Sequence, residues 1–177
     1  IDQSAKTILV TSSNPGEGKS VTVANLGVTM AQAFLKTVIV DTDLRQPSIH
    51  KIFEASNQAG LTNLIVSPEF QIDDYLQDTG IENLQIITSG PLPPNPAELL
   101  GSQRMIELLQ RLEERADVII FDSPPVLAVT DTIILSSQVD GVILVAKAKR
   151  TRRDAIRQSM SRLQQVGARL LGGVLNQ

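Results

Sequence analysis

The sequence predicts an α/β fold, in which a doubly wound, mainly parallel sheet is flanked by helices. Short runs rich in Val and Ile recur along the chain, and segments with a helical pattern separate them. These runs are apolar on both faces, as parallel strands are when helices cover the sheet on both sides. The 177 residues suit one domain, and because 42% are apolar but only 3% aromatic, the core must be aliphatic.

Six runs are expected to form the strands. In chain order they are Thr7 to Thr11, Thr37 to Val40, Leu84 to Thr88, Val118 to Phe121, Gly141 to Val145 and Leu170 to Leu175. The crossovers that join such strands are expected to be right-handed. The stretch from 55 to 84 is ambiguous, and short helices are expected there around Gly60 and Pro68.

A helix is expected from about Asn95 to Arg115. Asn95 can cap it, Pro96 suits the first helical position, and Glu98 stands where a capping box places its carboxylate. An apolar stripe follows at the i, i+3, i+4, i+7 spacing of a helix, formed by Met105, Leu108, Leu109 and Leu112. Gly101 and Ser102 mark a point where this helix can break early.

The segment SSNPGEGKSVT, residues 12 to 22, lies between the first predicted strand and a helical run that extends through Phe34. This layout is typical of a phosphate-binding loop, because glycines let backbone N–H groups turn toward an anion and the helix dipole adds positive potential. Lys19 would reach the β and γ phosphates, and Ser20 would bind Mg²⁺. The residues expected around the nucleotide are Pro15, Gly16, Glu17, Gly18, Lys19, Ser20 and Val21.

One departure from the loop motif and one excluded alternative narrow the interpretation of this segment. Ser13 stands six residues before the lysine, where the usual pattern has glycine. A dinucleotide-binding loop is excluded, because Val21 occupies the position at which that motif needs a third small residue. The loop therefore predicts a P-loop NTPase fold.

Carboxylates follow two of the predicted strands. Asp41 and Asp43 come just after the second strand, and Asp122 follows the run VIIF. Because the carboxyl ends of parallel strands share one edge of the sheet, all three are expected to converge on the loop. Acids beside a polyphosphate need a hard cation between them, so Mg²⁺ is expected on Ser20, Asp43 and Asp122.

Three further titratable residues are interpreted as structural. Asp131 is expected to cap a helix from Thr132 to Ser137, and Asp140 to lie in the turn before Gly141. His50 is the only histidine, and no metal-binding partners accompany it in the sequence.

Charge is unevenly distributed. The net charge is −3, yet the segment from Lys147 to Arg169 holds eight of the sixteen basic residues and one acid, Asp154. Arg150, Arg153 and Arg157 on one side of a predicted helix indicate either a solvated face or contact with an acidic partner or anionic membrane. The acidic total and five aromatic residues disfavour nucleic acid as a partner.

Cysteine and hydrophobic patterning exclude further classes. No cysteine is present, so neither disulfides nor thiolate metal sites can form. No apolar run reaches the roughly 18 residues of a membrane span, and no secretory signal is visible. The chain itself is thus expected to be soluble.

Taken together, three stretches resemble the bacterial tyrosine kinases, the cytoplasmic nucleotide-binding domains of polysaccharide co-polymerases. The first Walker motif is SSNPGEGKS, the additional Walker A-prime motif is VIVDTDLR, and Walker B is VIIFDSPP. Further likeness in RQPSIHKIF, PPNPAELL and GGVLN extends the resemblance over nearly the whole chain. The family tolerates serine at position 13, and it shares its P-loop branch with the partition and septum-placement ATPases.

The resemblance implies ATP-dependent tyrosine phosphorylation, largely between neighbouring subunits of a ring-shaped homo-oligomer. It also implies regulation of exopolysaccharide, capsule or lipopolysaccharide synthesis and export, through a membrane-embedded activator or a fused transmembrane domain at the inner face of the membrane. Carried over by motif, Lys19, Asp41, Asp43 and Asp122 are the catalytic residues, and ATP or ADP and Mg²⁺ are the ligands. Asp41 would be the base or would position the nucleophile, Arg45 would bind phosphate or a neighbouring subunit, and Asn176 would contact adenine.

The sequence also departs from the family pattern. Tyr75 is the sole tyrosine, so the family's tyrosine-rich tail is missing, as is the glutamate and arginine motif that usually precedes the first strand. Residues 1–177 are therefore expected to be a single kinase domain without its oligomerisation motif and tail. FLKTVIV lacks the glycine that usually ends the first helix, so that turn is expected to differ. A nucleotide-state switch, an ATPase without tyrosine phosphorylation, is the alternative function.

Overall fold

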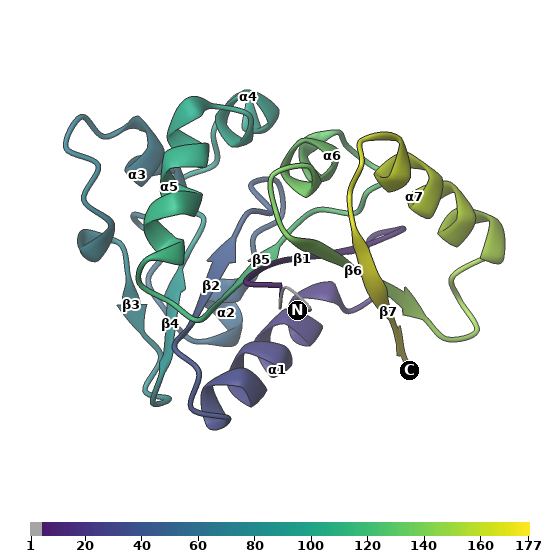
Figure 1. Cartoon of the computed structure of the whole chain (residues 1–177), viewed down its shortest axis with the longest axis horizontal. Coiled ribbons are helices and arrows are strands. Elements are labelled where there is room, and N and C mark those ends of the chain that lie inside the picture. Colours follow the sequence, from purple (N-terminus) through teal and green to yellow (C-terminus); the bar gives the residue numbers. More distant parts are fainter. Residues whose placement is uncertain (1–4) are drawn as a thin grey trace.

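The computed structural model describes residues 5–177 and shows a seven-stranded sheet with helices on both faces (Figure 1). The strands are β1 (Thr7–Ser12), β2 (Thr37–Asp41), β3 (Gln77–Asp78), β4 (Leu84–Ile87), β5 (Val118–Asp122), β6 (Gly141–Lys147) and β7 (Leu170–Asn176). Their order across the sheet is β3-β4-β2-β5-β1-β6-β7. All neighbours pair in parallel except β3 and β4, so the expected doubly wound, mainly parallel sheet is confirmed.

The helices follow the strands in alternation. They are α1 (Lys19–Gln32), α2 (Ile49–Ile52), α3 (Leu61–Val66), α4 (Pro96–Leu100), α5 (Gln103–Glu113), α6 (Asp131–Ser136) and α7 (Arg153–Gln165), with a 3-10 turn η1 (Ile72–Asp74). Among residues 5–177, no helix combines the length and apolar character needed to cross a bilayer.

Two apolar clusters hold the helices against the sheet. One cluster joins one face of the sheet to α3, α4, α5, α6 and α7, and the other joins the opposite face to α1 and α2. Neighbouring residues of one strand belong to different clusters: Leu9 packs on the first face, whereas Ile8 and Val10 pack on the second. This alternation explains why the central runs of these strands are apolar at consecutive positions.

The helix expected from Asn95 to Arg115 is two helices. The first helix ends at Gly101. The hydroxyl of Ser102 then accepts a 3.2 Å hydrogen bond from the Met105 N–H and caps the start of α5. Asn95 stands at the N-cap position of α4 as expected, but its side chain accepts no capping hydrogen bond, and its amide donates to Glu98. The apolar stripe of α5 is buried as expected.

Two details of the sheet differ from expectation. The antiparallel strand β3, only two residues long, was not predicted, because so short a strand leaves no periodic pattern. The run Leu170 to Leu175 does form the parallel strand β7, but most of its residues are exposed rather than buried on both faces. β7 is the edge of the sheet, so only β6 pairs with it.

The turn after α1 keeps a shape that normally requires glycine. Phe34 takes the left-handed conformation there, with φ 62°, and its side chain is 83% exposed. A non-glycine residue in this conformation is strained, because its Cβ approaches the following carbonyl oxygen. The missing glycine thus leaves the left-handed turn in place and puts strain at Phe34.

Strand order brings the predicted site together. β5 lies between β1 and β2, and Asp122 pairs in register with Val10 on one side and Asp41 on the other. The loop after β1 and the acids after β2 and β5 therefore meet at the carboxyl edge of the sheet, where ligands bind in folds of this kind.

Candidate active site

The loop between β1 and α1 bends through two glycines. Gly16 and Gly18 have φ of 75° and 89°, which other residues rarely adopt. A Cβ on Gly18 would overlap the side chain of Asn176, whose amide donates a 3.2 Å hydrogen bond to the carbonyl of Glu17. The end of β7 therefore packs directly on the loop, and Gly18 is the residue that permits this contact.

Glu17 anchors the loop from inside. Its carboxylate accepts hydrogen bonds from the backbone and side-chain amides of Asn14, at 3.0 and 3.1 Å, and from the Thr151 hydroxyl at 2.6 Å. The side chain is almost fully buried. The Glu17 side chain therefore stabilises the predicted phosphate-binding loop, and its carboxylate oxygens are already occupied by hydrogen bonds within the protein.

Lys19 begins α1 and contacts both acidic segments. Its Nζ lies 2.7 Å from Asp43 Oδ2 and 3.5 Å from Asp122 Oδ1, and it donates to the Ser20 hydroxyl at 3.4 Å. Burial lowers the pKa of Lys19, but the three nearby aspartates outweigh it and raise the pKa above its usual value. Lys19 is thus held as a cation between the carboxylates.

The segment after β2 folds around Asp41 and Asp43. Asp41 Oδ2 accepts from the N–H groups of Ser48 and Ile49, at 3.1 and 3.0 Å, and Asp41 Oδ1 accepts from the Asp43 N–H at 3.2 Å. Asp43 Oδ1 accepts from the Gln46 N–H at 3.0 Å. Burial raises the pKa of Asp41 to about 7, and the charge of Asp122 adds to the rise.

Asp122 is fully buried at the end of β5. Neither of its carboxylate oxygens makes a hydrogen bond of good geometry within residues 5–177, and the nearest positive charge is Lys19 Nζ at 3.5 Å from Oδ1. Burial raises the pKa of Asp122 to about 6, against the opposing effects of Lys19 and the Ser20 hydroxyl. A buried carboxylate with such weak contacts is costly, so besides its ion pair with Lys19 it has capacity to bind a further cation.

Ser20, Asp43 and Asp122 fit a Mg²⁺ ion that takes its other ligands from phosphate and water. In the described part of the chain, no three or more His, Cys, Asp or Glu side chains are arranged to hold a metal by themselves. That finding agrees with Mg²⁺ chemistry, since this ion keeps several waters and uses one or two carboxylates. The loop, Lys19 and the three aspartates thus lie together as the sequence predicts.

Comparison with known proteins identifies the family. A family model described as an AAA domain matches residues 5–172. The tyrosine-protein kinase YwqD of Bacillus subtilis (strain 168) is 39% identical over 176 residues, which cover 99% of this chain and 74% of that protein. The solved kinase domain of the Escherichia coli tyrosine kinase ETK matches with a TM-score of 0.94 and 32% identity, over 99% of this chain and 69% of that one.

This chain belongs to the bacterial tyrosine kinases.

Other neighbours agree with this assignment. The crystal structure of the chimerical protein CapA2B2 matches with a TM-score of 0.94 and 39% identity, over 99% of this chain and 77% of that chain. The septum site-determining protein MinD from Pyrococcus horikoshii, solved with Mg-ADP, has a TM-score of 0.79, 22% identity and coverage of 96% and 69%. At that identity MinD shows the shared fold alone, the P-loop NTPase fold.

The Arg45 side chain of this kinase domain pairs with α6. Its guanidinium forms a two-pronged ion pair with Asp131, through Nε at 2.8 Å and Nη2 at 3.0 Å. Asp131 was expected to cap α6, but Thr130 is the residue before the helix and Asp131 lies in its first turn. The buried Asp131 carboxylate is therefore a partner of Arg45, and the pair joins the segment after β2 to α6.

Several contacts of the kinase domain were not predicted. Ser13 pairs with Ser159 of α7, and Glu17 pairs with Thr151, in each case more than 130 residues away. Serine at position 13 was the visible signal for the first pair, but its partner could not be read from the sequence. His50 lies on α2, half-buried, and Asp140 accepts hydrogen bonds from the N–H groups of Lys6 and Thr7 beside β1.

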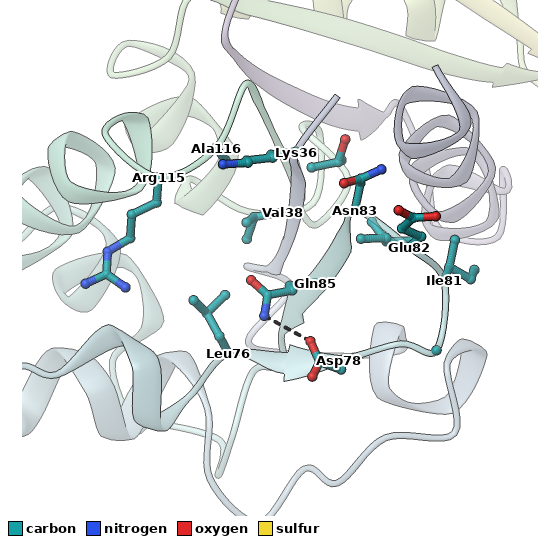
Figure 2. Close-up of a pocket in the computed structure, with 13 residues that line it drawn as sticks. Lys36, Val38, Leu76, Asp78, Ile81, Glu82, Asn83, Gln85, Arg115 and Ala116 are labelled. Carbon is teal, nitrogen blue, oxygen red and sulfur yellow. Dashed lines mark hydrogen bonds between the residues drawn. The ribbon is translucent and has the colours of Figure 1, made fainter. Parts of the chain in front are cut away.

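A second hollow is remote from these residues. It measures about 720 Å³ and lies at the opposite end of the sheet, where β2 and β4 begin (Figure 2). Lys36, Glu82 and Asn83 line it, and a 3.0 Å hydrogen bond joins Gln85 to Asp78. Val38, the first residue of the Walker A-prime run, lines it, but the phosphate-binding loop, Lys19 and the three aspartates do not, so it is separate from the kinase site.

Proposed function

We propose that this domain transfers the γ-phosphoryl group of ATP to tyrosine hydroxyls and thereby regulates exopolysaccharide or capsule production. The observation that carries the proposal is the contact of one lysine, Lys19, with acids from two separate segments, Asp43 and Asp122. This arrangement supplies both signs of charge that a metal-bound triphosphate requires. Because the chain belongs to the tyrosine kinase family, a tyrosine hydroxyl is favoured as the phosphate acceptor.

In this proposal the protein acts by positioning and charge neutralisation. The loop N–H groups hold the phosphates, and Lys19 leaves Asp43 to reach the β and γ phosphates. Ser20, Asp43 and Asp122 would hold Mg²⁺, which when bound neutralises charge on the phosphate oxygens. The tyrosine oxygen bonds to the γ phosphorus, its proton passes to Asp41 or to water, the bond to the β-phosphate oxygen breaks, and ADP leaves.

Asp41 stands as the candidate proton acceptor or as the group that positions the nucleophile. A pKa raised to about 7 suits a base near neutral pH. Yet its carboxylate is fully buried, and both oxygens already accept backbone hydrogen bonds. These contacts favour positioning, because a tyrosine hydroxyl reaches Asp41 only if the segment from Asp43 to Ser48 moves.

Adenine contact by Asn176 remains part of the proposal. The Asn176 side chain lies on the loop at Glu17, which places it beside the phosphates' binding segment. Arg45 is proposed to act on the acceptor side of the site rather than on phosphate, since Asp131 holds two of its nitrogens.

The partner is proposed to be a membrane-embedded activator or a fused transmembrane segment at the cytoplasmic face of the membrane, within a homo-oligomeric ring. This chain matches only 23% of the length of the tyrosine-protein kinase Etk of E. coli (strain K12), at 33% identity over 169 residues. In that relative, therefore, the kinase region is one part of a much longer protein. Nucleic acid is not proposed as a partner.

The test is to incubate the protein with Mg-ATP and a tyrosine-containing peptide, and to map phosphotyrosine by mass spectrometry. Lys19→Met is expected to lose phosphotransfer because the phosphates lose their cation. ATP turnover without phosphotyrosine on any acceptor would favour the nucleotide switch instead. Full nucleotide affinity and activity in Lys19→Met would contradict both functions.

A further inference from the structure

A groove of about 700 Å³ opens beside the catalytic carboxylates. The segment after β2, from Arg45 to Lys51, forms one wall, and Asn57 with residues 90–92 forms the other. The first wall is the same segment that holds the acids: Gln46 donates to Asp43, and Ser48 donates to Asp41. A ligand that binds along this wall therefore contacts the segment after β2, which positions Asp41 and Asp43.

The groove is basic in an acidic protein. Its lining contains Arg45, His50 and Lys51 and no acidic side chain, whereas the whole chain has a net charge of −3. Lys51 is exposed, and the Arg45 side chain is 45% exposed although it pairs with Asp131. His50 Nδ1 is buried and has no hydrogen-bond partner within residues 5–177. Arg45 and Lys51 supply positive charge, whereas burial and the charge of Lys51 lower the pKa of His50, so that the neutral imidazole supplies an unused hydrogen-bonding nitrogen.

The far wall is held in place by side-chain contacts. Asn57 Oδ1 accepts hydrogen bonds from the Gly90 N–H at 2.9 Å and from the Ser89 hydroxyl at 3.1 Å, and its amide donates to the Gly90 carbonyl at 3.3 Å. Pro47 and Pro91 also line the groove and restrict the backbone there. A fixed groove of this kind loses little entropy when an extended peptide binds.

We propose that this groove binds the segment around the acceptor tyrosine and selects an anionic side chain beside that tyrosine. Lys51, His50 and Arg45 would receive the anion, which is a carboxylate or the phosphate of an already modified tyrosine. The inference rests on the proposed phosphotransfer function, because it assigns the acceptor half of the same site. It makes Lys51 a residue that determines specificity.

The experiment compares three peptides that each hold one acceptor tyrosine, flanked by Glu, by Gln or by phosphotyrosine. With Mg-ATP, kcat/KM is expected to be about five- to tenfold higher for the Glu peptide than for the Gln peptide. Lys51→Glu is expected to remove this preference, so that kcat/KM for the Glu peptide falls to or below that for the Gln peptide. Lys36→Glu is the matched control, since Lys36 is exposed and lines the remote hollow.

The phosphotyrosine peptide separates the two sources of the anion. If its kcat/KM exceeds that of the Glu peptide, the groove selects phosphate, and if its kcat/KM is lower, the groove selects a carboxylate. Equal kcat/KM for the Glu and Gln peptides, or an unchanged preference in Lys51→Glu, would overturn the inference. Binding of labelled peptides in the presence of a non-hydrolysable ATP analogue is measured in parallel. If the Glu peptide binds more tightly but no phosphotyrosine forms, the groove stands and the phosphotransfer function fails.

Discussion

The hydroxyl oxygens of Ser13 and Ser159 lie 2.8 Å apart, and both side chains are fully buried. Ser13 opens the phosphate-binding loop at the position where the usual motif has glycine, and Ser159 lies on α7. The departure from the motif therefore has a structural reason. The Ser13 hydroxyl connects the loop to a helix that begins more than 130 residues later.

Ser159→Ala is expected to lower the free energy of unfolding by about 1–3 kcal/mol, because it leaves the Ser13 hydroxyl buried without this partner. Chemical denaturation measures the change. In the double variant Ser13→Ala/Ser159→Ala the loss is expected to be smaller than the sum of the two single losses. Ser161→Ala, on an exposed position of the same helix, is the control and is expected to be neutral. Additive losses would show that the two hydroxyls do not interact.

Phe34→Gly is expected to stabilise the protein by about 1 kcal/mol, since glycine adopts the left-handed conformation without the strain of a Cβ. Little packing is lost, because the ring is 83% exposed. The melting temperature is expected to rise by about 2–4 °C for a domain of this size. Phe34→Ala retains the Cβ and is expected to give no such rise.

The nucleotide-free protein is expected to lose stability as pH increases from about 4 to about 7. Asp41 and Asp122 have ordinary pKa values of 3.8 but folded values of about 7 and about 6. Between those values the folded state binds more protons than the unfolded state, so raising the pH favours unfolding. Urea denaturation at pH 5 and pH 8, without nucleotide or metal, measures how the free energy of unfolding changes with pH.

Asp122→Asn tests the source of that slope. The neutral amide removes one buried charge, so the variant is expected to be more stable than the parent protein at pH 8 and to depend less on pH. Phosphotransfer is expected to be lost in the same variant. A slope as steep as that of the parent protein would mean that other groups cause it.

Arg45→Ala is expected to destabilise the fold by about 1–2 kcal/mol, because the fully buried Asp131 carboxylate loses its partner. The expected cost is at the low end for a buried charge because the arginine is nearly half exposed. Arg45→Lys keeps the charge but not the two-pronged geometry, so it is expected to recover only part of the loss. Thermal denaturation compares the three proteins, and full recovery with lysine would show that charge alone matters.

Tyr75→Phe is expected to leave phosphorylation of an added peptide unchanged. Tyr75 is partly buried and packs against the apolar cluster on the α5 side of the sheet, so its position suits a core contact. Phosphopeptide mass spectrometry after incubation with Mg-ATP checks this. Phosphate on Tyr75 in the folded parent protein would contradict the expectation.

Much of the site could be predicted from the sequence because it depends on chain order. Glycines and a lysine after one parallel strand, and aspartates after two others, must reach the same edge of the sheet once helices connect the strands. Lys19, Asp43 and Asp122 therefore lie together in the structure as expected. No detail of side-chain packing was needed for that result.

The missed contacts depend on how the helices pack. Arg45 meets Asp131 across 86 residues, and Ser13 meets Ser159 across 146, at distances that only the placement of α6 and α7 determines. Asp131 was assigned to a cap because aspartate near a helix start usually has that role, and a long-range ion pair overrode this local preference. The break at Ser102 was visible in the sequence because capping is a local interaction.

The contact of Lys19 with Asp43 also affects how a ligand enters. In the structure Lys19 is already the counterion of Asp43 and Asp122, so its positive charge is paired within the protein. Under the proposed function, a triphosphate that arrives with its metal would replace the aspartates as partner of Lys19 while the metal would take the place of Lys19 beside the aspartates. Binding would then be an exchange of ions, and a nucleotide without metal is expected to bind more weakly because it brings no cation for the aspartates it uncovers.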